Sequence, residues 1–422
     1  MRDFGQYKDT GVVGTAWLIW LCLLFAPVLA PAATGLFLLC CLLFRTAARP
    51  SRSQVLAGAF FILSFVLLLL QFPFAADRQA QGFETEKKLC FLVLPLCFWL
   101  YRWTPAMLLQ LLRGYLALVA AAGLFCLLCS CRAYWQHQDT AVFFYHRLGA
   151  PLELHAVYFS LYVSIASACL VFVPAILPSR SWRIALKLFL LLLILLLSSK
   201  LFLVLQLALY GLDLLRAGQW YRRYWWLCVL PLPVVFLLGR MPVAERFRDI
   251  RLERTSLIHE PQLADSVYLD GLSFRLLQWK NGMEILQERH ALLSGLPSGD
   301  ASAAYRQKIR EKKWYTGADG QSGYLPYNMH NQYLETWIRS GLTGLLLLCG
   351  LLSLLFYAAW KKGSGLLLTL FLLYAFFFCT ESVLERQAGV LPFCFTVLLC
   401  LSCSHTQRPA ENRDHFLNLS GS

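Results

Sequence analysis

The chain has 422 residues, of which 58% are hydrophobic and only 15% are charged. A soluble globular domain carries about 25% charged residues, so the composition excludes an ordinary soluble protein. The net charge of +14 does not indicate nucleic-acid binding either. Most Lys and Arg residues stand singly or in pairs at the ends of apolar runs, or are balanced by acids in one long loop, which is the pattern of membrane orientation.

Long runs without any charge predict membrane-spanning helices, for example 114–129, 188–197 and 366–379. A helix that crosses the hydrocarbon core needs about 20 mainly apolar residues, and Leu-rich runs without alternation favour helices over barrel strands. The pattern predicts an all-α polytopic membrane protein with about twelve spans. They lie near 12–30, 33–44, 54–72, 88–101, 106–130, 155–177, 184–197, 199–215, 224–240, 338–358, 363–379 and 387–403. The pair 184–197 and 199–215 also fits one long tilted helix with a break.

The distribution of cations predicts how these spans are oriented. Cytoplasmic connections are enriched in Lys and Arg. With the N-terminus in the cytoplasm, these connections hold Arg45, Arg49, Arg52, Arg102, Arg180, Arg183, Lys187, Arg216, Arg222, Arg223, Lys361 and Lys362. We therefore expect spans one to about nine in 1–240, a large outer loop in 241–337, about three further spans in 338–403, and a cytoplasmic tail in 404–422. The connection 131–154 also lies outside, and the first apolar run is expected to be a retained helix.

The outer segment 241–337 is the largest polar region. It contains an amphipathic stretch, Ser273–Arg289, whose start Ser273 can cap. A loop is predicted at Ser294–Asp300 from its Ser, Gly and Pro residues. The fifteen cysteines lie in or beside apolar runs, which indicates buried thiols. Even the closest group, Cys126, Cys129 and Cys131, lacks the spacing of a zinc site.

The segment from Tyr327 to Gly344 is the most informative one. His330 stands where the polar loop becomes a membrane span, and a neutral imidazole there can accept a proton from an attacking hydroxyl. Asn331 can orient a sugar or the imidazole, and Gly341 and Gly344 allow a neighbouring helix to pack closely. The second interpretation is an interfacial histidine that only bonds a loop carbonyl.

His330-Asn331, nine residues, and then Gly341-Leu-Thr-Gly344 resembles the His-Asn…Gly-x-x-Gly motif in the last large periplasmic loop of the O-antigen ligase family, within the O-antigen ligase/polymerase superfamily. The resemblance implies a GT-C-like architecture in the bacterial inner membrane, with short helices in the large periplasmic loop and the active site facing the periplasm. It implies a glycosyltransferase that moves a glycan from undecaprenyl pyrophosphate to lipid A–core oligosaccharide or another glycan acceptor. Polymerases of the same superfamily and protein O-oligosaccharyltransferases share the donor and stay open as alternatives.

The leaving pyrophosphate needs cations, and arginine binds phosphate with two parallel hydrogen bonds. The resemblance implies that Arg275 is catalytic together with His330, because the family carries an arginine in this loop. Lys200 stands where relatives often have arginine, and Arg147 precedes an outer helix end. Both are expected to bind the substrate. The alternative for each cation is a snorkelling interfacial side chain.

Other polar and aromatic side chains near these positions have two interpretations each. His155 and Glu153 can activate an acceptor, or they can cap a helix N-terminus, which is the favoured interpretation. Trp279, Trp314 and Tyr333 can stack on sugar rings, or they can belong to an interfacial aromatic belt, which is again favoured. Of these, His155, Trp279 and Asn331 are expected to contact the substrate.

The outer loop has scattered acidic residues and no Asp-x-Asp motif, so no metal site and no cofactor are expected. Direct displacement at the anomeric carbon would invert its configuration. A transporter or flippase is the alternative from a different class. It predicts charges near the middle of the spans, where this chain has almost none except Arg113.

Overall fold

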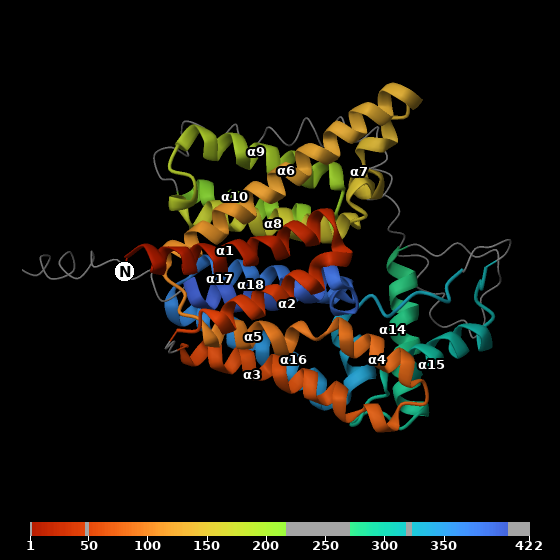
Figure 1. Ribbon diagram of the computed structural model, residues 1–422. Coiled ribbons are helices and arrows are strands. Elements are labelled where there is room, and N and C mark those ends of the chain that lie inside the picture. Colours follow the sequence, from red (N-terminus) through yellow and green to blue (C-terminus); the bar gives the residue numbers. More distant parts are fainter. Residues whose placement is uncertain (1, 47–49, 217–270, 318–322, 404–422) are drawn as a thin grey trace, which may run out of the picture.

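The computed structural model describes residues 2–46, 50–216, 271–317 and 323–403, and every regular element within them is helical. Figure 1 labels the α-helices. The first ten are α1 (Arg2–Phe25), α2 (Ala30–Leu43), α3 (Arg52–Leu70), α4 (Arg78–Lys87), α5 (Cys90–Leu100), α6 (Pro105–His137), α7 (Tyr145–Gly149), α8 (Ala156–Phe172), α9 (Arg180–Leu197) and α10 (Lys200–Arg216). The others are α14 (Gly271–Glu288), α15 (Ser298–Glu311), α16 (Gln332–Lys362), α17 (Gly365–Thr380) and α18 (Gln387–Cys403).

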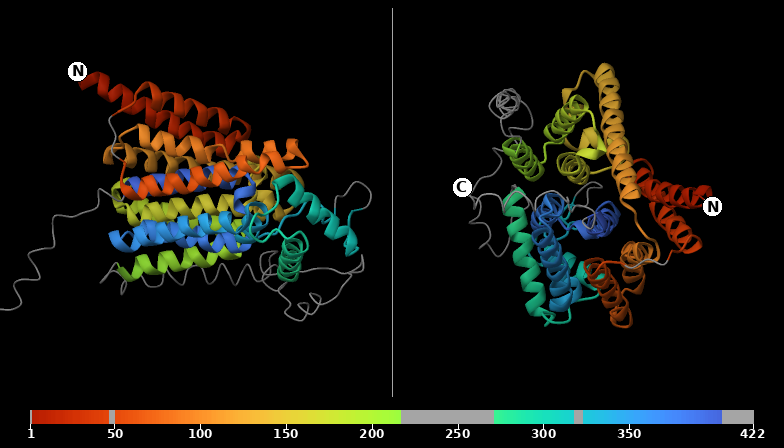
Figure 2. Two further views of the ribbon diagram at one scale, coloured as in Figure 1. Left: turned by 90° about the horizontal axis from the view of Figure 1, so that it is seen from below. Right: turned by 90° about the vertical axis from the view of Figure 1, so that its left-hand side faces the viewer.

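The long apolar helices run side by side as a bundle, and α4, α7, α14 and α15 gather at one of its ends, which we call the loop end (Figures 1 and 2). Aromatic side chains fill the core of the bundle. The Trp20 ring of α1 lies 4.5 Å from Tyr115 of α6 and 5.5 Å from Phe395 of α18, centroid to centroid. A second, smaller core joins α14 and α15 to the start of α16 through residues such as Leu286, Ile309 and Ile338.

Among the described residues, four helices are long and apolar enough to cross a membrane: Tyr7–Phe25, Arg52–Phe74, Pro105–His137 and Gln332–Lys362. A pair bent by 80°, Tyr145–Leu152 with Ala156–Phe172, forms a possible fifth span, and shorter apolar helices lie at Pro27–Leu43, Gly365–Thr380 and Gln387–Ser402. The predicted all-helical, multi-pass membrane protein is therefore confirmed in this coarse form. The number of about twelve spans stays a prediction, and the expected span 224–240 and the tail 404–422 lie outside the described residues.

The interval 184–215 forms two helices rather than one long tilted helix. Ser198, with φ 54°, ends α9 in the left-handed conformation, and α10 begins at Lys200. Lys187 in the first half of α9 forms an ion pair with Asp213 near the end of α10, and its carbonyl accepts a hydrogen bond from Tyr210. These contacts require α9 and α10 to run antiparallel from the turn at Ser198.

Several of the helix ends that lie opposite the loop end (Figure 1) carry cations. The last turns of α2 and α5 meet there, where the Thr46 N–H donates to the Leu100 carbonyl over 3.1 Å. The residues at this end include Arg45, Arg102, Arg180, Arg216, Lys361 and Lys362. Arg113, the exception within a span, donates to the carbonyls of Ala175 and Ile176 in the turn after α8. Which end of the bundle faces the cytoplasm stays a prediction.

The outer segment differs from its prediction in two places. Ser273 lies inside α14, with its side chain fully buried, and does not stand before the first turn as an N-cap. The predicted loop Ser294–Asp300 ends early, because α15 begins at Ser298. The Ser298 N–H donates to the buried side chain of Gln81 in α4 over 2.7 Å, and this tertiary contact fixes the helix start. Helix α4 was not expected from the sequence, whereas α15 agrees with the short helices expected in the outer loop, although its position was not predicted.

Helix α16 has a break at Gly341, where φ is 63° and ψ is −169°. This conformation is essentially restricted to glycine. A Cβ at Gly341 would lie 2.0 Å from the Leu293 carbonyl oxygen, and one at Gly295 would lie 2.3 Å from the Gly341 nitrogen. The predicted close neighbour at Gly341 is therefore the loop after α14 and not another helix. A Cβ at Gly344 would meet Ser340 of the same helix.

We expect Gly341→Ala to lower the free energy of unfolding by about 2 kcal/mol or more, because alanine meets both an unfavourable backbone conformation and a backbone atom. Thermal unfolding of the purified protein in detergent measures the effect. Gly35→Ala in α2 is the control, because nothing lies within 4 Å of its added Cβ. Equal melting temperatures for the two variants would contradict the proposed packing at Gly341.

Candidate active site

His330 occupies a constrained turn at the loop end, immediately before α16. Its φ of 44° is unusual for a residue with a side chain, and its N–H donates to Asn328 Oδ1 over 3.1 Å. Asn331 is the N-cap of α16, where its Oδ1 accepts from the Leu334 N–H over 3.1 Å. The Asn331 oxygen is thus engaged in capping, and a contact between Asn331 and a sugar stays a prediction.

The imidazole of His330 is held by a carboxylate that the sequence analysis did not place in the site. His330 Nδ1 lies 2.9 Å from Glu381 Oε2. Glu381 follows the last residue of α17, and its side chain is only 15% exposed. The sequence offered one signal: Glu381 is an acidic residue in a short connection on the side predicted to face outward.

Arg275 of α14 reaches the same carboxylate from the other side. Its Nη2 lies 3.2 Å from Glu381 Oε1, while Nε donates to the Thr380 carbonyl and Nη1 to the Gly271 carbonyl. The structure therefore brings His330 and Arg275 together at Glu381. An arginine has five N–H donors, and these three contacts leave two of them without a partner among the described residues.

Glu381 is ionised under ordinary conditions. Burial alone would raise the pKa of its carboxyl, but the hydrogen bond from His330 and the charge of Arg275 outweigh burial and lower this pKa. An ionised carboxylate only accepts hydrogen bonds, so Nδ1 of a neutral His330 carries the proton. The other ring nitrogen, Nε2, then presents its lone pair, as a general base requires.

His155 lies beside this group as part of a histidine pair. Its ring centroid is 3.8 Å from that of His146, and the Ala156 N–H donates to His146 Nδ1 over 3.4 Å. Burial, the neighbouring His146 and Arg386 lower the pKa of His155 to about 4, so it is neutral at physiological pH. His155 occupies the N-cap position of α8 without a side-chain capping bond, and Glu153 is exposed. The capping interpretation is therefore wrong for the side chain of His155, and for Glu153 it stays a prediction.

The two other predicted cations do not reach the His330–Glu381 pair in any described contact. The Arg147 side chain is 60% exposed and forms an ion pair with Asp139. Lys200 begins α10 at the loop end, where the Phe202 ring packs 5.0 Å from Phe377 in the last turn of α17. Both therefore lie toward the same end as Glu381, and their binding of substrate stays a prediction.

The aromatic side chains hold the outer segment together. Trp279 Nε1 donates to the Met329 carbonyl over 3.0 Å, directly before His330. Trp314 is buried in the smaller core formed with α14 and α15, so its assignment to an interfacial belt is wrong. Tyr333 of α16 donates its hydroxyl to the Ala375 carbonyl of α17 over 3.0 Å. Of the three, Trp279 is the one that contacts the turn carrying His330.

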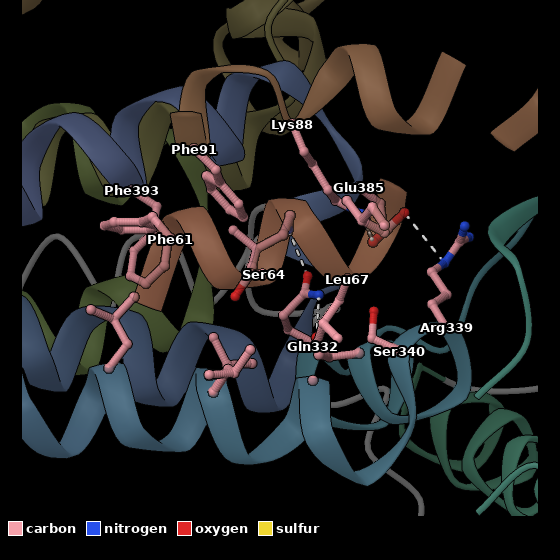
Figure 3. A pocket seen from close by; sticks show the side chains of 17 residues that line it. Phe61, Ser64, Leu67, Lys88, Phe91, Gln332, Arg339, Ser340, Glu385 and Phe393 are labelled. Carbon is pink, nitrogen blue, oxygen red and sulfur yellow. Dashed lines mark hydrogen bonds and ion pairs between the residues drawn. The ribbon is translucent and has the colours of Figure 1, made fainter. Parts of the chain in front are cut away.

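A crevice between α3, α16 and η8 (Val383–Glu385) lies next to this site. Its inner part is lined by apolar side chains such as Phe61, Phe91 and Phe393, and its polar part by Lys88, Gln332, Arg339 and Glu385 (Figure 3). Glu385 forms ion pairs with Lys88 over 3.1 Å and with Arg339 over 3.4 Å. Burial would raise the pKa of Glu385, but these two cations hold it well below its ordinary value. The buried charges here are thus paired, as their desolvation requires.

The cysteines in the tightest group, Cys126, Cys129 and Cys131, are free thiols, but the expectation of buried thiols is wrong for Cys131, Cys349 and Cys379, which are exposed. Within the part of the chain that the structure describes, no group of three or more His, Cys, Asp or Glu side chains has the arrangement of a metal site. Whether the reaction proceeds without a metal ion stays a prediction.

The lowered pKa of Glu381 predicts a pH dependence of stability. A group whose pKa falls on folding contributes stability above its unfolded pKa, near 4.5, and loses it as the pH falls through the lower folded value. The difference in melting temperature between the wild type and Glu381→Gln should therefore be constant from pH 7 to about 5 and shrink below about 4.5. Scanning fluorimetry in detergent measures it. Glu86→Gln, at an exposed position of α4, is the control, and an undiminished difference for Glu381→Gln at the lowest pH would contradict the assignment.

Comparison with known proteins agrees with this geometry. A family model described as O-antigen ligase matches residues 160–349, a stretch that contains Lys200, Arg275 and His330 but not Glu381. A search of curated proteins found no match. The matched stretch ends within α16, after the glycine break that follows His330. Residues 160–349 of this chain are therefore similar to the O-antigen ligase family, and the match indicates the O-antigen ligase/polymerase superfamily.

Proposed function

We propose that the protein is an O-antigen ligase that transfers a glycan from undecaprenyl pyrophosphate to the lipid A–core oligosaccharide on the periplasmic face of the inner membrane. One observation carries the proposal: Glu381 lies between His330 and Arg275, with one carboxylate oxygen toward each. A base and a phosphate-binding cation are the two groups that such a transfer needs, and the family match provides the reaction class.

His330 acts as the general base in this proposal. Glu381 orients the imidazole through Nδ1, so Nε2 takes the proton from the acceptor hydroxyl. The hydroxyl oxygen then attacks the anomeric carbon of the donor sugar, and the bond between that carbon and the diphosphate oxygen breaks. The proton stays on His330, and the configuration at the anomeric carbon is inverted. The Glu381 carboxylate stabilises the imidazolium that forms.

Arg275 stabilises the leaving diphosphate. Negative charge accumulates on the diphosphate as the glycosidic bond breaks, and a fixed guanidinium lowers the energy of that transition state. The contacts to Gly271, Thr380 and Glu381 fix the guanidinium, and two of its N–H groups have no partner among the described residues, so we propose that they bind phosphate oxygens. Lys200 and Arg147 supply further positive charge along the glycan or the diphosphate, and His155 and Trp279 line the acceptor side.

The direction of the site across the membrane follows from the cations. Arg102, Arg216 and Lys361 are among those at the end of the bundle opposite the loop end. By the positive-inside rule that end faces the cytoplasm, so His330 faces the periplasm. A periplasmic site suits a donor whose glycan is presented outside and whose polyprenyl chain stays in the bilayer.

Deletion of the gene, followed by a lipopolysaccharide gel, tests the function. We expect free lipid A–core and an accumulated carrier-linked polymer, because donor synthesis continues while transfer stops. Core bearing a single repeat would instead indicate a polymerase, and a normal ladder would contradict both functions. A glycoprotein that loses its glycan while the ladder persists would indicate a protein O-oligosaccharyltransferase.

Complementation of the deletion strain tests the proposed base. The wild-type gene should restore the ladder, whereas His330→Ala should reduce transfer by at least about a hundredfold while the protein remains in the membrane. His290→Ala is a matched control, because His290 also has a positive φ (52°) but is exposed at the end of α14. Wild-type ladders from His330→Ala would exclude His330 as the base.

Arg275→Lys should lower kcat by about tenfold to a hundredfold. Lysine keeps the charge, but its single ammonium group does not reproduce the planar arrangement that reaches Gly271, Thr380 and Glu381 at once. Arg289→Lys, at the exposed end of the same helix, should leave kcat unchanged. Transfer from carrier-linked donor to extracted lipid A–core, with purified protein, measures both. A wild-type kcat for Arg275→Lys would leave Arg275 a structural role only.

A further inference from the structure

Glu335, in the first turn of α16, contacts both sides of the His330–Glu381 pair. Its Oε2 accepts from the Met329 N–H over 3.0 Å and from Ser382 Oγ over 3.3 Å. Met329 directly precedes His330, and Ser382 directly follows Glu381. One oxygen atom of a side chain that is 4% exposed thus links the two segments that carry the imidazole and its carboxylate partner.

The other oxygen of Glu335 is fixed by an arginine of the same helix. Arg339 Nε lies 2.6 Å from Glu335 Oε1 and 3.4 Å from Glu385 Oε2. Figure 3 shows Arg339 directed toward Glu385, which Lys88 approaches from the other side. A buried carboxylate needs such a partner to remain ionised at its position. Because Arg339 fixes Oε1 of Glu335, it also fixes the position from which Oε2 accepts hydrogen bonds from Met329 and Ser382.

A second side chain of α16 strengthens the link. Gln332, which is 1% exposed, accepts the Leu384 N–H on Oε1 over 2.6 Å and donates to Thr336 Oγ1 over 3.0 Å. Gln332, Glu335 and Arg339 are spaced by three and four residues, so they share one face of the helix. Together they bind the segment 381–385, which we call the Glu381 segment, to the first two turns of α16.

The turn at His330 requires this support. A residue with a side chain keeps a positive φ only when its surroundings determine that conformation, because the conformation costs about 1 kcal/mol or more. The Met329 N–H bond to Glu335 and the Trp279 bond to the Met329 carbonyl fix the peptide groups just before His330. Loss of Glu335 would remove the first of these and at the same time release Ser382 beside Glu381.

We propose that Glu335 is a positioning residue that keeps His330 and Glu381 in hydrogen-bonding register during transfer. The inference rests on the proposed role of His330 as the base. It assigns Glu335 no contact with substrate, since the side chain is buried and both of its oxygens bind protein groups. A displacement of reacting groups by about 1 Å costs up to about a hundredfold in rate, so a loosened pair should be measurable in kcat.

The test compares purified full-length Glu335→Gln with wild type, using carrier-linked donor and lipid A–core extracted from the deletion strain. An amide cannot accept from Arg339 and the Met329 N–H on both of its ends, because one end is a donor. We expect kcat to fall by about tenfold or more, with KM within about threefold of wild type. Glu335→Asp keeps the charge on a shorter side chain, so its kcat should fall less than that of Glu335→Gln. Glu284→Gln is the matched control, because Glu284 forms ion pairs with Lys308 and Lys312 away from His330.

A double-mutant cycle with Glu381→Gln separates positioning from a general loss of folded protein. If Glu335 acts through the pair, Glu335→Gln should have little further effect once Glu381 is replaced. If Glu335→Gln lowers kcat by the same factor in the wild type and in the Glu381→Gln variant, the inference is overturned. If Glu381→Gln alone leaves too little activity to measure, the pH profile of kcat of Glu335→Gln is compared with that of the wild type instead. A changed profile shape in Glu335→Gln supports positioning, and a proportional loss at every pH overturns it.

The variants also distinguish a failure of the positioning role of Glu335 from a failure of the proposed function. If His330→Ala is inactive while Glu335→Gln keeps wild-type kcat, only the positioning role fails and the proposed function stands. If His330→Ala keeps wild-type transfer, the proposed base fails, and the role of Glu335 fails with it.

Discussion

The carboxylate of Glu381 is the point on which the arrangement of the loop end depends. It ends α17, accepts from His330 at the start of α16, and pairs with Arg275 of α14, so it joins three helices through two oxygens. A carboxylate with little exposure is stable as an ion only if its desolvation is offset by such partners. The same requirement that keeps Glu381 charged therefore also fixes the tautomer of the imidazole and the place of the guanidinium.

The buried charges around the Glu381 segment extend this arrangement into the bundle. Glu335, Arg339, Glu385 and Lys88 alternate in sign through successive ion pairs between α16, η8 and the turn after α4. Removing one member of such a chain leaves its neighbours uncompensated, so the chain behaves as a unit. It lies next to an apolar crevice whose far wall is made by α3 and α18. These ion pairs connect the Glu381 segment to α16 and to the turn after α4.

The outer segment is attached to the bundle by backbone contacts that only glycine permits. The loop after α14 approaches the break of α16 at Gly341 so closely that a Cβ on either Gly341 or Gly295 would overlap the opposing backbone. The Leu296 N–H donates to the Ile338 carbonyl over 2.7 Å in the same region. These contacts hold the loop after α14 against the break in α16.

The sequence by itself determined the features that depend on local composition. Apolar runs place the helices because an unsatisfied backbone is too costly in lipid, and the cations at helix ends divide the two sides of the bundle. The motif at His330 identified the base candidate, and the family resemblance identified Arg275.

Only the tertiary structure decided that Glu381 joins them, because it lies 51 residues after His330 on another helix. It also decided that Ser298 begins a helix and that α9 and α10 fold back at Ser198, since contacts with Gln81 and between Lys187 and Asp213 outweigh local preference. The separation of Arg147 from the pair has the same origin: its nearby partner, Asp139, is set by the fold and not by hydropathy.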